Sequence, residues 1–301
     1  MKKGMIKAGI GLAVGGSLLI TTTILSMAQG PSGYEALKSA LKNTKKIENA
    51  TLVLSGKATD NQKDILDVNS TLKASHKDRK MSGTVSIKSD NTSKNISIFA
   101  DKDNHVMNVQ GTDTYYKFEC DKANIKAHFD EKENPQIEQI HEKILDAVVG
   151  DFKNQVKQVN SINGDKVLSV NLEKNNIPEI VDMMLSLHHN KEEAAIRKQT
   201  HFKIGEILGT DQADIKVPEL VSDVKANKIS LEVTVDKNNL IKEIDANINV
   251  SGKDEAGKVH NESLDLNTDI KDVNTTKVDT ISLQDKNVKT IKPGDLCPQM
   301  R

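Results

Sequence analysis

Apolar and polar residues alternate with a period of two along most of the chain. Between Ala50 and Ala100, four runs carry an apolar residue at every second position, separated by Ser, Thr, Asn, Asp and Lys. This alternation is typical of β-strands with one buried and one solvent-facing side. Short polar breaks between the runs favour antiparallel hairpins. These breaks lie at residues 60–61, 77–78 and 90–92, and a further hairpin is predicted from 105–109 and 114–118.

The same alternation returns near the C-terminus, where it is the clearest local signal in the chain. Apolar residues occupy every second position from Ile229 to Val235, from Ile244 to Val250, and from Leu264 to Leu266, followed by Ile270. Polar or glycine-containing segments join these runs at 237–239 and 252–257. Three antiparallel strands are therefore predicted.

In four other segments the apolar period changes to that of a helix. Ser32 and Glu35 have the spacing of a capping box and predict a helix that continues to about Lys46. The other predicted helices are 134–150, opened by Asn-Pro, 176–187, opened by Asn-Ile-Pro, and a shorter one from Pro218 to Val224. A strand containing Val167 to Leu172 is expected between the two longer helices.

These elements predict an α+β fold. Its main part is a large antiparallel β-sheet with helices packed on one face, since a sheet with one apolar side must cover that side. A hydrophobic helix precedes the sheet at the N-terminus. The two groups of hairpins are expected to share one sheet.

The first 30 residues have the pattern of an export segment. Lys2, Lys3 and Lys7 precede an apolar run from Ala8 to Leu25, which as a helix would be about 27 Å long, near the roughly 30 Å of a bilayer core. Ser26-Met27-Ala28 suits signal-peptide cleavage, whereas the length of the run suits a retained membrane anchor. The positive-inside rule places the rest of the chain outside the cytoplasm. We expect a signal peptide or anchor at 1–30 and one extracytoplasmic domain at 31–301.

The only two cysteines are Cys120 and Cys297. In an oxidising compartment this even number predicts a disulfide, which would tie the C-terminal tail to the sheet. The alternative is two free thiols.

Composition argues against several classes of partner. Lys and Arg number 42 and Asp and Glu 43, for a net charge of −1, so nucleic acid is not an expected partner. Aromatic residues are only 3% and Trp is absent, which argues against stacking surfaces for sugars or single strands. The sequence carries no G-x-S-x-G, phosphate-binding glycine loop or H-E-x-x-H motif. We therefore expect a protein that is not an enzyme and uses no metal or cofactor.

Two groups of residues were considered as sites. Met183, Met184 and Leu185 are candidate ligand-binding residues, because thioethers adapt to apolar ligands; ordinary core packing is the alternative. His188 and His189 point about 100° apart on a helix and do not converge on a metal. They are interpreted as solvent-exposed histidines.

The order of elements resembles the LolA and LppX type of lipoprotein-carrier fold found in bacterial envelopes. The likeness covers roughly residues 33–285 and is carried by the strands at 229–236 and 240–250, joined by Val-Asp-Lys-Asn-Asn-Leu at 235–240. In that family a strongly curved sheet wraps apolar helices around a cavity for acyl chains. The resemblance therefore implies a curved sheet and a lipid or lipopeptide ligand. Two features depart from the family: the lipid-bearing N-terminal cysteine of many members is absent, and no family binding residue can be placed individually.

Three functions follow as hypotheses. The first is a noncatalytic envelope protein that binds a lipid or another apolar ligand between sheet and helices. The second is a cell-surface structural or interaction domain that docks an envelope protein partner and takes no small-molecule ligand. The third, a hydrolase, would require a Ser or Cys within reach of a His in a cleft.

Overall fold

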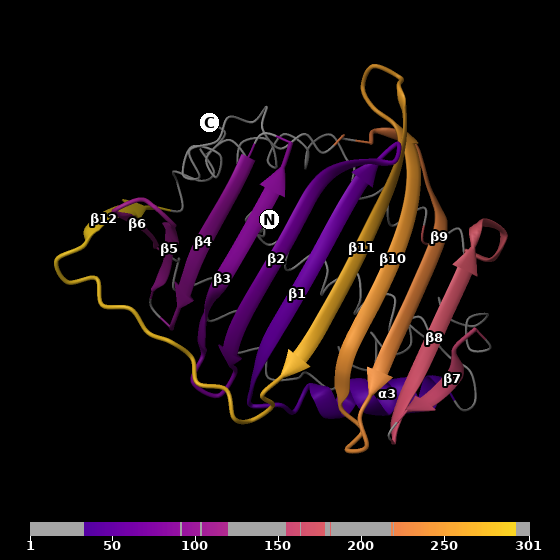
Figure 1. Ribbon diagram of the computed structural model, residues 1–301, viewed down its shortest axis with the longest axis horizontal. Coiled ribbons are helices and arrows are strands. Elements are labelled where there is room, and N and C mark those ends of the chain that lie inside the picture. Colours follow the sequence, from indigo (N-terminus) through magenta and orange to yellow (C-terminus); the bar gives the residue numbers. More distant parts are fainter. Residues whose placement is uncertain are drawn as a thin grey trace, which may run out of the picture.

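Twelve strands form one continuous sheet (Figure 1). The computed structural model describes residues 33–90, 92–102, 104–119, 155–162, 164–177 and 220–292, together with residues 181 and 218. The strand order is β12-β6-β5-β4-β3-β2-β1-β11-β10-β9-β8-β7. Each half of the chain therefore forms a run of hairpins. The pairing of β1 with β11 joins the two runs, and β12 from the C-terminal half pairs with β6 at the opposite edge of the N-terminal run.

The N-terminal half of the sheet is a meander of six antiparallel strands. Its strands are β1 (Asn49–Asp60), β2 (Lys63–Ser75), β3 (Lys80–Ser89), β4 (Thr92–Ala100), β5 (His105–Val109) and β6 (Thr114–Phe118). The predicted breaks are the observed turns, and the predicted hairpin at 105–118 has the expected bounds. This part of the sequence prediction is confirmed.

The C-terminal half supplies the remaining strands. They are β7 (Lys157–Ile162), β8 (Asp165–Glu173), β9 (Ser222–Val235), β10 (Ile241–Lys253), β11 (Val259–Lys271) and β12 (Asn287–Ile291), with a 3₁₀ turn, η1 (Lys174–Asn176), after β8. The three predicted strands near the C-terminus are confirmed as β9, β10 and β11. The sequence did not predict β7 or β12.

Registered rows of side chains give the sheet one apolar and one polar face. One row runs across six strands through Val68, Gly56, Leu266, Ala246, Leu231 and Val170, each directly opposite the next. The neighbouring row is polar: Asp67, Lys57, Asp265, Asn247, Ser230 and Asn171. Because side chains alternate between the two sides of a strand, these rows lie on opposite faces. We call them the apolar face and the polar face.

The helix α3 (Gly33–Thr44) lies across the end of the C-terminal strands (Figure 1). Leu37 and Ala40 are buried on its inner side. The Thr44 hydroxyl donates to the Ala40 carbonyl at 2.8 Å and accepts from the Ile241 N–H at 2.9 Å. The last turn of the helix is thereby tied to the start of β10. The predicted helix in this segment is confirmed.

The expected fold class is wrong. The sheet is mixed and not purely antiparallel, because β12 pairs parallel to β6. Within the described residues α3 is the one α-helix whose first and last residues are both described. No layer of helices packs on a face of the sheet in this part of the chain. The predicted helix at 134–150 and most of that at 176–187 lie outside the described residues. The N-terminal hydrophobic helix lies outside them as well.

The short helix predicted from Pro218 to Val224 is also wrong, because β9 begins at Ser222. Leu220 and Val221 precede this strand, and the register of β9 against β10 shifts between Ser222 and Lys225, where Asp223 has a positive φ of 54°. A β-bulge adds one residue to a strand and changes which positions face inward. The spacing of Leu220, Val221 and Val224, which suggested a helix, spans the segment that enters β9 and the bulge at the start of that strand.

A connecting segment, residues 272–286, leads from β11 to β12 past the lower ends of β1, β2 and β3 (Figure 1). We call it the strap. It begins with Asn274, whose N–H donates to the Asn49 carbonyl at 2.8 Å. The hydroxyls of Thr51 and Thr276 then lie 2.9 Å apart. These contacts hold the strap against the polar face.

Candidate functional site

The apolar face carries two clusters of buried side chains. The first lies on β8 to β11 and includes Leu168, Leu231, Val233 and Ile248. The helix α3 contributes Leu37 and Ala40, and Ile177 and Val181 pack against its rim. We call this the helix-side cluster. It is a conventional core in which a helix packs against strands.

The second cluster lies on the other half of the apolar face. Its buried members are Val68, Leu72, Val85, Ile87, Ile96, Met107, Val109 and Ile291. Leu52, Leu66, Ile98, Tyr116 and Phe118 surround them as half-buried residues. Every one of these residues belongs to a strand. We call it the strand-side cluster, because all of its described members belong to strands.

The strand-side cluster is deeply buried. Val85 is 0% exposed and Ile96 1% exposed, and the two face each other across β3 and β4. Burying such side chains is worth about 1.5–3 kcal/mol each. The same chemistry, a dry surface of Val, Ile, Leu and Met, would hold hydrocarbon chains equally well.

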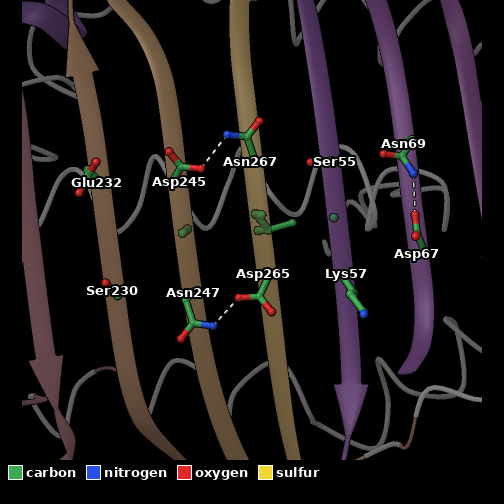
Figure 2. Close-up of a pocket in the computed structure, with 13 residues that line it drawn as sticks. Ser55, Lys57, Asp67, Asn69, Ser230, Glu232, Asp245, Asn247, Asp265 and Asn267 are labelled. Atoms are coloured by element: carbon green, nitrogen blue, oxygen red, sulfur yellow. Dashed lines mark hydrogen bonds between the residues drawn. The ribbon is translucent and has the colours of Figure 1, made fainter. Parts of the chain in front are cut away.

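The polar face is hollowed across β9, β10, β11, β1 and β2 (Figure 2). The hollow measures about 470 Å³. Its floor is made of two adjacent polar rows. They contain Ser55, Lys57, Asp67, Asn69, Ser230, Glu232, Asp245, Asn247, Asp265 and Asn267.

Amides and carboxylates in this hollow satisfy one another across strands. The Asn267 amide donates a hydrogen bond to the Asp245 carboxylate at 2.6 Å, and the Asn247 amide donates to the Asp265 carboxylate at 2.5 Å (Figure 2). Lys57 is paired with Asp64 at 2.8 Å, a contact that raises the pKa of the lysine. The described residues that line the hollow include no Ser, Cys or His arranged as a nucleophile and base. Its chemistry suits hydrogen bonding to a polar partner.

A third feature lies at the end of the sheet where the β1–β2 and β10–β11 hairpins turn. The imidazole of His260 is 5% exposed and stands between the carboxylates of Asp60 and Asp254. Glu262, which is directly opposite Asp60 in the sheet register, lies beside it. Burial, with a smaller contribution from Asp60, raises the pKa of Glu262 to about 7. We call these four residues the acid–histidine cluster.

Sequence reasoning missed the acid–histidine cluster, although the sequence contains a signal for it. Counting back by two from Leu266 and Leu264 along β11 reaches Glu262 and then His260, which places both on the dry side of the strand. Ionisable residues at dry positions require partners. The position of Asp60 at the end of β1 completes the pattern.

The residues predicted from the sequence to form sites lie elsewhere. Met183, Met184 and Leu185 are outside the described residues, as are Cys120, Cys297 and the run from Ala8 to Leu25. His188 and His189 are outside them too. Among the residues that the structure does describe, no group of three or more His, Cys, Asp or Glu could hold a metal ion, and no helix is long and apolar enough to cross a bilayer.

Comparison with known proteins gives a coarse likeness to solved structures. No family model matches the sequence, and no curated protein matches it. Among solved structures, a LolA superfamily protein from Nitrosomonas europaea is similar to this chain with a TM-score of 0.24 and 7% sequence identity. The match covers 84% of this chain and 96% of that chain. The likeness is a weak architectural one, and it identifies no residue role in this protein.

Proposed function

We propose that this protein is a noncatalytic binding protein that holds an apolar ligand, such as the acyl chains of a lipid, against the strand-side cluster of its apolar face. The observation that carries the proposal is the strand-side cluster itself, a single patch of apolar side chains contributed by β1 to β6 and β12. A dry sheet surface of this kind suits hydrocarbon.

A variant pair on β4 tests the proposal. Ile98 is a half-buried member of the strand-side cluster, and Ser97 is the adjacent residue on the opposite face. Ile98→Lys places an ammonium group against the proposed ligand surface, whereas Ser97→Lys adds the same charge to the polar face. Both variants are compared with the wild-type chain after circular dichroism has shown that the strand content is unchanged.

Two measurements are made on these proteins. Native mass spectrometry and solvent extraction report any lipid that copurifies, and titration with a fluorescent fatty acid reports binding directly. We expect Ile98→Lys to weaken fatty-acid binding at least tenfold and Ser97→Lys to change it less than twofold. Equal binding by the two variants, or an absence of both copurified lipid and fatty-acid binding in the wild type, would rule out the proposal.

The proposed place of action is outside the cytoplasmic membrane. This part of the proposal depends on the lysines and the apolar run of residues 2–25. Intact-mass measurement of the protein from the cell envelope and from the medium distinguishes a retained anchor from cleavage after residues 26–28. A reporter fused after Arg301 that is active only in the cytosol would contradict an extracytoplasmic location.

The alternative is a structural or interaction domain with no small-molecule ligand. It is favoured by one observation: the two described hollows, each of about 470 Å³, are lined mainly by polar residues. Under this alternative the apolar face is filled entirely by protein side chains, and the polar face meets an envelope protein. Crosslinking on cells through a photoreactive residue at Ser230, in the hollow that spans β9 to β2, would then recover a partner while fatty-acid binding is absent.

A further inference from the structure

His260 connects two hairpins that are far apart in the sequence. Its Nδ1 lies 2.9 Å from Oδ2 of Asp60, at the end of β1. Its Nε2 lies 3.2 Å from Oδ2 of Asp254, in the turn between β10 and β11. Both ring nitrogens therefore face a carboxylate, and the two carboxylates belong to different hairpins.

This geometry depends on the charge of the imidazole. An imidazolium has two N–H groups and donates to both carboxylates at once. A neutral imidazole has one N–H, so its other nitrogen would present a lone pair to a carboxylate oxygen. Loss of the proton thus replaces one charge-assisted hydrogen bond by a repulsive contact.

The carboxylates around His260 make this contact depend more strongly on the charge of the imidazole. Oδ1 of Asp60 and Oε1 of Glu262 are buried side-chain oxygens that accept no hydrogen bond in the described part of the chain. Asp60 and Glu262 are directly opposite each other in the register of β1 and β11. With His260 neutral, two carboxylates would share this buried corner without a compensating charge.

Other charged groups in the described part of the chain also lie near this corner. Lys258, in the β10–β11 turn, opposes the charge on His260, and its N–H donates to Asp254 at 2.9 Å. On β10 the residues opposite Glu262 and His260 are Val250 and Gly252, which carry no charge. On β2 and β10 the nearby lysines are engaged elsewhere: Lys63 pairs with Asp90, and Lys253 pairs with Asp223.

The shifts in pKa agree with this arrangement. The hydrogen bond to Asp60, with further help from Asp254, raises the pKa of His260, although burial opposes the effect. Hydrogen bonds from the Lys258 N–H and from His260 lower the pKa of Asp254. Both shifts favour the charged histidine with its two carboxylates over the neutral imidazole.

We propose that the acid–histidine cluster is a proton-dependent clasp: it joins the β1–β2 hairpin to the β10–β11 hairpin while His260 is charged and loosens this end of the sheet when His260 loses its proton. The clasp acts on the fold itself and does not depend on the proposed ligand. The clasp is closed where His260 is protonated and Asp60 and Asp254 are ionised, and it loosens as the pH rises through the pKa of His260.

The test uses the full chain and two readouts. NMR of the imidazole carbons follows the ionisation of His260, which should occur above the ordinary range for histidine. Hydrogen exchange, expressed as protection factors so that the intrinsic pH dependence is removed, follows the amides of residues 58–62 and 252–262. We expect their protection to fall on the order of tenfold between pH 6 and pH 9, the effect of losing about one hydrogen bond. The β9–β10 hairpin serves as the internal reference.

The variant Asp254→Asn separates the clasp from a merely structural contact. The Asn side chain can accept the Lys258 N–H through its oxygen and donate from its amide to the lone pair of a neutral imidazole. This variant should therefore keep its protection at pH 9. His76→Gln, a change at an exposed histidine in the β2–β3 turn, should behave as the wild type. Unchanged wild-type protection between the two pH values, an equal fall in Asp254→Asn, or ionisation of His260 below the ordinary range would each overturn the proposal.

Discussion

Phe118 of β6 lies directly opposite Ile291 of β12, in the sheet's one parallel pairing within the described residues. The Glu119 N–H continues this pairing by donating to the Ile291 carbonyl at 2.9 Å. Since parallel strands run in the same direction, the chain leaves both strands at the same end of the sheet. Residues that follow 119 and 292 therefore start from neighbouring points.

This relationship leads to a prediction for the two cysteines, which themselves lie outside the described residues. Cys120 comes two positions after Phe118, and Cys297 comes six positions after Ile291. Six residues reach at most about 20 Å, enough to bring two Cα atoms to the roughly 4.4–6.8 Å of a disulfide. We expect peptide mapping of the unreduced, exported protein to find the Cys120–Cys297 crosslink.

The crosslink should also affect stability. Closing so long a loop stabilises the folded state by about 5 kcal/mol in the chain-entropy model. The variant Cys297→Ser should therefore unfold at a lower urea concentration than the wild type, and the difference should vanish when both are reduced. Recovery of both cysteines as free thiols from the exported protein would contradict the prediction.

The buried hydroxyl of Ser82 contributes more to holding the strap in place than the ion pair between Lys73 and Asp279 does. Ser82 is 0% exposed. Its Oγ accepts from the Asp279 N–H at 2.9 Å and donates to the Asp279 carboxylate at 3.3 Å. Lys73 pairs with the same carboxylate at 3.0 Å, but both of these side chains are substantially exposed to solvent.

We therefore expect unequal effects from two substitutions at this contact. Ser82→Ala leaves the Asp279 N–H without its acceptor and should lower the free energy of unfolding by about 1–2 kcal/mol. Lys73→Met removes a solvent-screened pair and should cost no more than about 0.5 kcal/mol. Urea unfolding of both variants gives the comparison, and a larger loss for Lys73→Met would contradict it.

The sequence predicts the strands of this fold well, because their signal is local. Between Ile229 and Val235 the strand can be read from apolar residues at alternate positions, without knowledge of any partner. In β12, Asn287 pairs with Thr114, a partner from the other half of the chain. The segment has only Val288 and Ile291 as apolar residues, so nothing local marks it as a strand or shows that it is parallel.

The same distinction between local signals and distant pairing explains why the acid–histidine cluster was not predicted. His260 and Asp60 are brought together by the pairing of β1 with β11, and no motif within either segment records the other. Alternation along β11 could have indicated a buried histidine, but not its partners. The wrong prediction of a helix around Val224 has a different cause. A β-bulge changes the spacing of the apolar residues, although the segment is still a strand.

Gly83 is required by the close approach of two strands. An added Cβ would lie 2.2 Å from the Thr71 carbonyl oxygen and 2.9 Å from the Leu72 Cα. Both are backbone atoms, so β2 and β3 would have to move apart. We expect Gly83→Ala to lower the free energy of unfolding by roughly 2–4 kcal/mol.

Gly56 provides the matched comparison on the same face. There the nearest atom to an added Cβ is the tip of Leu266, at 3.0 Å, which can rotate away. Gly56→Ala should cost less than about 1 kcal/mol, partly offset by the reduced freedom of the unfolded chain. Thermal unfolding of both variants measures the difference. Equal destabilisation would show that the backbone contact at Gly83 is not the reason for the glycine.

Glu262 makes the stability of the protein depend on pH. Its pKa is about 7 in the folded chain, compared with an ordinary value of 4.5. Because the folded state holds the proton more tightly, the stabilising contribution is fully present below pH 4.5 and is lost as the pH rises through 7. His260 acts in the same direction, since its pKa is also raised.

Replacing Glu262 by Gln should remove this loss. The variant should equal the wild type near pH 4.5 and exceed it at pH 8 by roughly 1–2 kcal/mol, a figure reduced to allow for the partial exposure of the carboxylate. Urea unfolding at the two pH values measures this, with Glu232→Gln on the exposed polar face as the control. A variant that is less stable than the wild type at pH 8 would mean that the ionised Glu262 carboxylate stabilises the folded chain, contrary to the burial that raises its pKa.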